Sequence, residues 1–195
     1  NLEASEYAKK ENNDIARDAR LKGEIGNARD PAKGPLTESA DVHDDTYADG
    51  KRAARVVELL QGYAEAKDKA PFFLAVGLTK PHLPFVAPQK YWDLYQRDSF
   101  KMPPNKGLPP GYPEYASNHM AYEMHKYSDF EGESPKDFSD QLNGRLLHGY
   151  AACVSYIDAS IGRILNSLEE TGLSKNTIVV VLSDHGWKLG DHSSW

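Results

Sequence analysis

The residues best suited to chemistry stand near the end of the sequence, where an apolar run leads directly into Asp184 and His185. The run TIVVVLSD over 177–184 is typical of a strand buried on both faces of a parallel sheet. Open α/β sheets bind ligands beyond the carboxyl ends of such strands. A carboxylate and an imidazole in succession, with Gly186 allowing a tight turn, can present two ligands to one metal ion. The alternative is that Asp184 caps a following helix and that His185 has no role.

A second candidate, His82, follows another apolar run, FFLAVGL over 72–78, which also predicts a buried strand. Pro81 and Pro84 exclude a helix and a strand ladder around it, so we expect His82 on a stiff loop. A histidine in that setting can stabilise a developing anion or protonate a leaving oxygen. Lys80 would add positive charge for an anionic substrate. The alternatives are a histidine that only hydrogen-bonds within the loop and a lysine on the solvated surface.

Aromatic and polar residues follow the metal candidates, namely Trp187, His192 and Trp195. Aromatic faces beside polar groups suit the wall of a sugar pocket, although packing in the core is the alternative for a tryptophan. Cys153 lies within an apolar helical stretch, which predicts a core thiol rather than a nucleophile. The remaining histidines show no ligand spacing and are predicted to be surface or packing residues: His43, His119, His125 and His148.

Two long helices are predicted to position these segments. Apolar residues recur at helical spacing over 47–67, where Thr46 and Asp49 resemble a capping box. A second apolar stripe begins near Ser139 and ends before Gly172, which suits the left-handed residue after a helix. The order of helix, strand, helix and strand predicts an α/β fold whose largely parallel central sheet is flanked by helices.

Two other regions lack regular patterning. The first 45 residues are polar and predict loops with a short helix near 6–20. The segment 96–140 is rich in proline, glycine, tyrosine and charge, without clear periodicity. Its length exceeds the usual limit of about 12–15 residues for an irregular loop. We therefore expect this excursion to be functional or supported by another part of the protein.

Composition excludes several classes of protein. Hydrophobic residues make up 39% of the 195 residues and charged residues 27%, which is typical of a folded globular protein. A net charge of −6 with scattered basic residues argues against a nucleic-acid partner. No apolar run approaches the roughly 20 residues of a membrane span. Cys153 is the single cysteine, so no internal disulfide can form.

Three stretches together resemble the type I sulfatases of the alkaline phosphatase superfamily, specifically the iduronate-2-sulfatase branch and its bacterial relatives. They are PFFLAVGLTKPHLPFVAPQKYWDLY, HGYAACVSYIDASIGRILNSLEETGL and TIVVVLSDHGWKLGDHSSW. The resemblance covers most of residues 35–195 in order and approximate spacing. It implies an alkaline-phosphatase-like α/β fold and the hydrolysis of sulfate monoesters, with sulfated saccharides as expected substrates. It also suggests a periplasmic or secreted protein.

The resemblance assigns roles to the residues already singled out. It implies that Asp184 and His185 are ligands of a calcium ion and that His82 contacts the sulfate. It places Trp187 at the sugar pocket. Further matched motif positions are Lys80 and His192, expected to bind substrate. On chemistry alone, an Asp–His pair suits zinc or manganese better than calcium, which prefers oxygen ligands.

The sequence also departs from the family pattern. A family nucleophile is a formylglycine made from cysteine or serine in a C-x-P-S-R or S-x-P-x-R signature, which these residues lack. We therefore expect residues 1–195 to be the central part of one sulfatase catalytic domain, completed by the remainder of that polypeptide. The alternatives are a phosphoesterase or phosphonate hydrolase of the same superfamily, using zinc or manganese, and a non-catalytic fragment that binds sulfated glycan.

Overall fold

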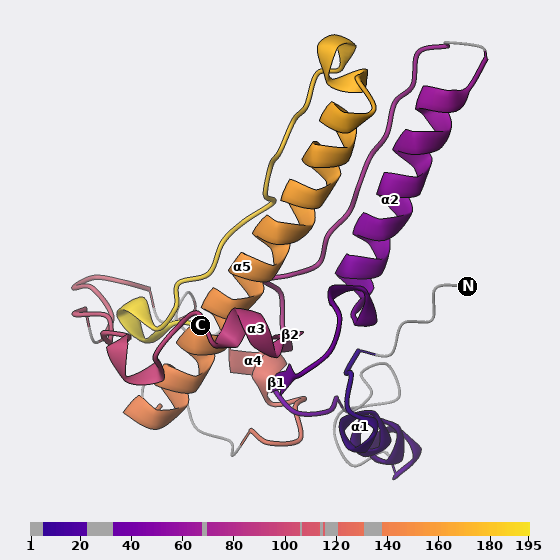
Figure 1. Cartoon of the computed structure of the whole chain (residues 1–195). Coiled ribbons are helices and arrows are strands. Elements are labelled where there is room, and N and C mark those ends of the chain that lie inside the picture. Colours follow the sequence, from indigo (N-terminus) through magenta and orange to yellow (C-terminus); the bar gives the residue numbers. More distant parts are fainter. Residues whose placement is uncertain are drawn as a thin grey trace.

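The computed structural model is organised around two long helices, α2 (Ala48–Glu65) and α5 (Asp140–Glu170), which lie side by side (Figure 1). The structure describes residues 6–22, 33–67, 70–105, 107–113, 115, 121–130 and 138–195. The other α-helices are α1 (Lys10–Lys22), α3 (Gln89–Trp92) and α4 (Ala121–Met124). Short 3-10 helices are η1 (Asp44–Thr46), η2 (Arg97–Ser99), η5 (Leu173–Asn176) and η6 (Asp191–Ser193), and the strands are β1 (Thr37–Ala40) and β2 (Phe85–Pro88).

Both long helices confirm the predictions made from apolar periodicity. At the start of α5, the Ser139 hydroxyl accepts a hydrogen bond from the N–H of Leu142 at 3.1 Å. Beyond its end, Gly172 has a φ of 73°, the left-handed conformation that glycine adopts without strain. The predicted capping box of α2 is wrong, because Tyr47 precedes the helix and makes no side-chain cap. The side chain of Asp49 instead accepts hydrogen bonds from the backbone N–H groups of Thr79 and Lys80.

The two strands pair in parallel, with Thr37 opposite Phe85 and Ala40 opposite Pro88. Parallel pairing within an α/β arrangement confirms the predicted fold class, but neither strand was predicted: β1 lies in the polar stretch expected to be loop, and β2 follows the loop of His82. Helix α5 crosses β2 closely at Gly149. A Cβ atom at Gly149 would lie 2.8 Å from the Cβ of Phe85, so a side chain there would force the helix away from the strand.

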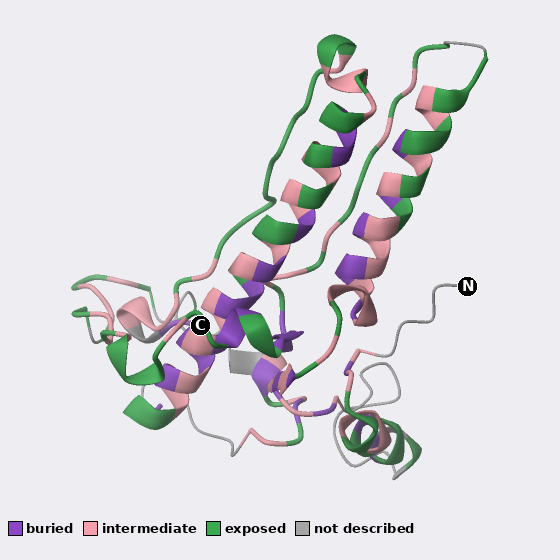
Figure 2. Cartoon of the chain, in the orientation of Figure 1, coloured by how far each residue is buried: buried purple, intermediate pink, exposed green. Residues whose placement is uncertain are grey.

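The predicted strands at 72–78 and 177–184 are wrong for this structure. Both segments run extended beside the long helices without a strand ladder (Figure 1). Much of both segments is exposed (Figure 2), with Phe73 94% and Ile178 93% exposed, although Phe72 and Leu74 pack against the long helices. A strand needs a neighbour for its backbone N–H and C=O groups. In the described part of the chain, the sheet consists of β1 and β2 alone, so neither segment has that neighbour.

The main core lies where β2, α3 and α5 meet, and a smaller one joins the distal parts of α2 and α5 through Val56, Leu60 and Leu168. From 96 to 130 the described residues carry only η2 and α4 as regular elements. Even the long α5 has no stretch apolar enough to qualify as a membrane span among the helices described.

Cys153 lies in the core, as predicted, and its thiol should therefore react slowly. Its side chain is fully buried and its thiol donates to the carbonyl of Val86 at 3.6 Å. Burial raises the pKa of the Cys153 thiol to about 12, which removes the reactive thiolate at neutral pH.

We predict that iodoacetamide at pH 8 alkylates Cys153 at least about 100-fold more slowly in the folded protein than in urea. Mass spectrometry over time measures both rates on the same cysteine, so the unfolded chain is its own control. Equal rates would show that the thiol is accessible and would contradict the packing described.

Candidate functional site

The loop at 79–84 is attached to the start of α2 by one buried carboxylate. Asp49 is 2% exposed, and its two oxygens accept hydrogen bonds from the backbone N–H groups of Thr79 and Lys80, each at 2.9 Å. Arg52 donates to the same carboxylate at 2.6 Å and to the Thr79 hydroxyl at 2.9 Å. A buried carboxylate is costly unless it is satisfied in this way, so the interaction fixes where the loop leaves the extended segment.

Within the loop, the backbone is closed on itself. The N–H of His82 donates to the carbonyl of Thr79 at 3.0 Å. The Lys80 ammonium donates to the carbonyls of His82 at 2.9 Å and Pro84 at 2.7 Å. Burial lowers the pKa of Lys80. The structure therefore shows Lys80 bonded to its own loop, where its charge stabilises the turn that carries His82.

The imidazole of His82 is held on one side and open on the other. Its Nδ1 lies 2.7 Å from the carbonyl of Leu83, and since a carbonyl only accepts, Nδ1 carries the proton and donates. Nε2 lies 3.6 Å from a carboxylate oxygen of Glu123, and the side chain is 46% exposed. The ring also meets the edge of Trp187, with ring centroids 6.3 Å apart.

Sequence reasoning missed two charged residues, Glu123 beside His82 and Lys33, which pairs with Glu123. Glu123, on α4, lies with one oxygen 2.8 Å from the ammonium of Lys33 and the other facing His82. Lys33 also donates to the hydroxyl of Tyr127 at 3.1 Å. Burial and the nearby Glu123 charge raise the pKa of Tyr127, so its hydroxyl stays neutral. Glu123 lies in an excursion without periodicity and Lys33 in a polar stretch, so no pattern indicated either residue.

The predicted metal pair, Asp184 and His185, is exposed. Their side chains are 88% and 64% exposed, and the carboxylate lies 3.6 Å from the ring nitrogen of its neighbour. The His185 ring also lies 3.1 Å from the carbonyl of Gly186. No hydrogen bond or ion pair joins either residue to His82 in the described ranges. The side chain of Trp187, a short distance along the chain, is the part of this segment that reaches His82.

This pair fits only part of a metal site. Calcium takes about 6–8 oxygen ligands, whereas Asp184 and His185 offer one carboxylate and one imidazole. Across the residues that the structure describes, no group of three or more His, Cys, Asp and Glu side chains could hold an ion. The two residues can therefore act as ligands only together with donors from elsewhere.

The last turn of the chain packs against the excursion. Trp187 is half-buried and contacts Phe85, with ring centroids 5.7 Å apart. His192 donates its backbone N–H to Asn105 at 2.8 Å, and its ring lies 3.0 Å from the carbonyl of Gly107. Trp195 is fully buried, and its indole N–H donates to the side chain of Asn143 at 2.8 Å. Trp187 therefore lies at the candidate site, and Trp195 is a packing residue.

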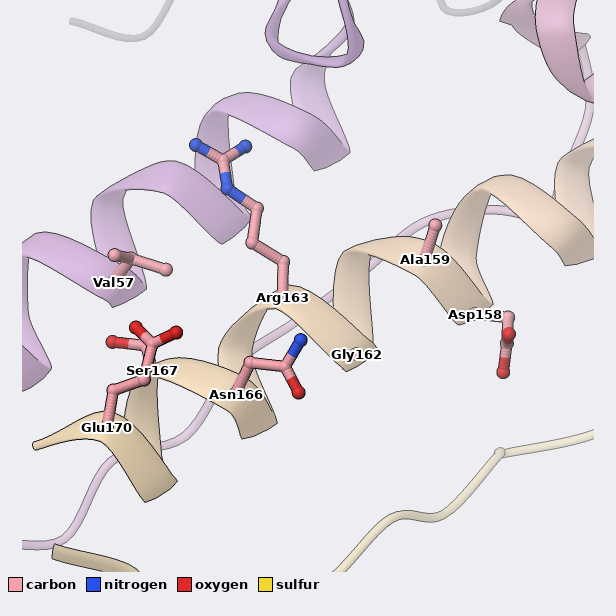
Figure 3. A pocket seen from close by; sticks show the side chains of 8 residues that line it. All are labelled: Val57, Asp158, Ala159, Gly162, Arg163, Asn166, Ser167 and Glu170. Carbon is pink, nitrogen blue, oxygen red and sulfur yellow. The ribbon is translucent and has the colours of Figure 1, made fainter. Parts of the chain in front are cut away.

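A separate pocket of about 490 Å³ lies between α2 and α5 (Figure 3). Its lining residues are Val57, Asp158, Ala159, Gly162, Arg163, Asn166, Ser167 and Glu170. Arg163 is ion-paired with Asp45 at its edge. None of the residues predicted to do chemistry lines this pocket, so the candidate site is the neighbourhood of His82.

Comparison with known proteins places the chain in a family. Residues 7–194 match the Sulfatase family. The chain is 33% identical to human iduronate 2-sulfatase over 163 residues, which cover 80% of the chain and 28% of that protein. It is 34% identical to a sulfatase of Formosa agariphila over 129 residues (65% of the chain, 24% of that protein). It is 30% identical to choline-sulfatase of Rhizobium meliloti over 129 residues (66% and 24%).

These matches agree with the resemblance drawn from the K-P-H and D-H-G segments. The chain spans about a quarter of the length of the curated relatives it matches, as the coverages of 28%, 24% and 24% show. The family match extends over nearly the whole chain, including the loop of His82 and the segment of Trp187. The chain belongs to the sulfatase family of the alkaline phosphatase superfamily.

Proposed function

We propose that the intact protein containing this chain hydrolyses sulfate monoesters, with sulfated saccharides as its substrates. The observation that carries the proposal is the loop of His82, fixed by Asp49 in a chain that matches the sulfatase family from residue 7 to 194. Sulfatase-named relatives support the reaction class. The half-buried Trp187 beside His82 supports a ring-shaped substrate, since aromatic faces suit the apolar side of a sugar.

In this proposal His82 acts through Nε2. Because Nδ1 donates to the carbonyl of Leu83, Nε2 is the ring nitrogen left for substrate. When protonated, it can donate to a nonbridging sulfate oxygen or to the leaving oxygen, which stabilises the negative charge that develops there. Lys80 would add positive charge from the same loop, and His192 would contribute at the edge formed with the excursion.

The nucleophile would be a formylglycine outside the residues of this chain. Cys153, the single cysteine, cannot replace it, because the thiol is buried and protonated at neutral pH. The remainder of the sulfatase polypeptide would therefore complete the site. A non-catalytic fragment that binds sulfated glycan is the outcome expected if no such nucleophile exists.

Asp184 and His185 would provide two ligands of a metal ion, which is calcium by the family resemblance. When bound, such an ion would supply positive charge to the sulfate oxygens. The imidazole in the pair is the specific observation that favours a second candidate, a phosphoesterase or phosphonate hydrolase that uses zinc or manganese. The identity of the bound metal therefore distinguishes the two candidates.

Kinetics on two aryl esters test the reaction class and the role of His82. We expect the intact protein to cleave 4-nitrophenyl sulfate with a higher kcat/KM than 4-nitrophenyl phosphate. His82→Ala should lower kcat/KM for the sulfate by about 10²- to 10⁴-fold, the range for loss of a general acid. His43→Ala serves as the control, because that histidine is exposed and its ring accepts a hydrogen bond from the N–H of Asp45 in its own turn. A preference for phosphate, or an unaffected His82 variant, would refute the assignment.

Metal analysis tests the role of Asp184 and His185. Mass-spectrometric metal analysis of the purified intact protein should find calcium, and Asp184→Ala or His185→Ala should reduce the calcium bound per protein. Asp98→Ala, at an exposed position in η2, is the matched control and should retain the ion. Zinc or manganese in place of calcium would favour the phosphoesterase, and full retention by both variants would remove this pair from the metal site.

A further inference from the structure

We propose that Glu123 makes the His82 site selective for singly charged sulfate esters over doubly charged phosphate esters. The inference rests on the proposed function, in which the ester anion binds at Nε2 of His82. The selectivity would arise from the position of the Glu123 carboxylate, its partial neutralisation by Lys33 and the charge of the ester.

The two carboxylate oxygens of Glu123 have different neighbours. Oε1 lies 2.8 Å from the Lys33 ammonium, and Oε2 lies 3.6 Å from Nε2 of His82. The segment that carries Glu123 is tied to Lys33 by a second contact, since the backbone N–H of Lys33 donates to the carbonyl of Lys126 at 2.9 Å. The carboxylate is therefore held beside Nε2 of His82, the ring nitrogen proposed to bind the ester.

Lys33 offsets this negative charge only in part. Its ammonium bonds to Oε1 of Glu123 and also donates to the hydroxyl of Tyr127, so its charge is shared between two oxygen atoms. The side chains of Lys33 and Glu123 are 24% and 30% exposed, so solvent screens them incompletely. An anion at Nε2 would lie close to Oε2 of Glu123, which faces the ring, whereas Lys33 bonds to the other oxygen.

An ester oxygen that accepts from Nε2 would lie about 3 Å from that nitrogen. The anion would then lie within a few ångströms of the Glu123 carboxylate and would be repelled by it. A sulfate monoester carries one negative charge, whereas a phosphate monoester carries about 1.5–2 at neutral pH. The second charge feels the same repulsion again, so Glu123 penalises phosphate more than sulfate. For a partly screened pair at this separation, we expect a factor of about ten.

The test compares the two esters in the intact protein with and without the charge. Glu123→Gln keeps the shape of the side chain and removes its charge. We expect kcat/KM for 4-nitrophenyl phosphate to rise relative to that for 4-nitrophenyl sulfate by about tenfold at pH 8. Lys33→Met should move the ratio in the opposite direction, because it removes the cation that offsets Glu123. If the substitutions only destabilised the fold, both rates would fall in each variant. The ratio would not rise in Glu123→Gln and fall in Lys33→Met.

Glu58→Gln is the matched control. This glutamate is exposed on α2 and also ion-paired, with Arg55, so its loss of charge should leave the ratio unchanged. Thermal melting of every variant checks that each one is folded. An unchanged ratio in Glu123→Gln, or shifts of the same sign in the glutamate and lysine variants, would overturn the inference.

A binding measurement separates this inference from the proposed function. Isothermal titration calorimetry at pH 8 gives the Kd of ethyl sulfate and of ethyl phosphate without any turnover. If the protein cleaves neither aryl ester, the proposed function fails, and the ratio of the two Kd values still decides the role of Glu123. If the protein cleaves the sulfate and neither ratio moves in Glu123→Gln, the function stands and the inference is wrong.

Discussion

The buried carboxylate of Asp49 is the interaction on which the rest of the site depends. It joins the first turn of α2 to the backbone N–H groups of Thr79 and Lys80, which follow Asp49 by 30 and 31 positions in the sequence. Hydrogen bonds to a charged group contribute about 1.5–3 kcal/mol each. Because the loop is fixed there, His82 lies beside Glu123 and Trp187, which belong to distant segments of the chain.

The helices were predictable because their signals are local. Apolar periodicity and a Ser139 cap define α5, and the same periodicity defines α2. The strands were not predictable in this way, because an apolar run forms a strand only where a neighbouring strand exists to receive its hydrogen bonds. The runs at 72–78 and 177–184 have the composition of buried strands but no such neighbour in the described chain. The polar β1 forms a strand because β2 lies beside it.

The candidate site was predictable only where residue type and motif coincide. His82 stands between prolines after an apolar run, and its ring lies beside that of Trp187. Its approach to Asp184 and His185 remains a prediction, to be tested in the intact protein. Asp49 carried a signal that was interpreted as a helix cap, because a carboxylate near a helix start is usually one. The hydrogen-bond partners of Asp49 and the ion-pair partners of Glu123 are distant in the sequence, so no local pattern can reveal them.

Hydrogen exchange in the intact protein tests the central claim most directly. If the Asp49 carboxylate fixes the loop, the amide protons of Thr79 and Lys80 exchange slowly, as amides bonded to a buried group do. Asp49→Asn should release both amides while those within α2 keep their protection, and Asp45→Asn, at the Arg163 ion pair, should leave them unchanged. Fast exchange of Thr79 and Lys80 in the unaltered protein would contradict the account.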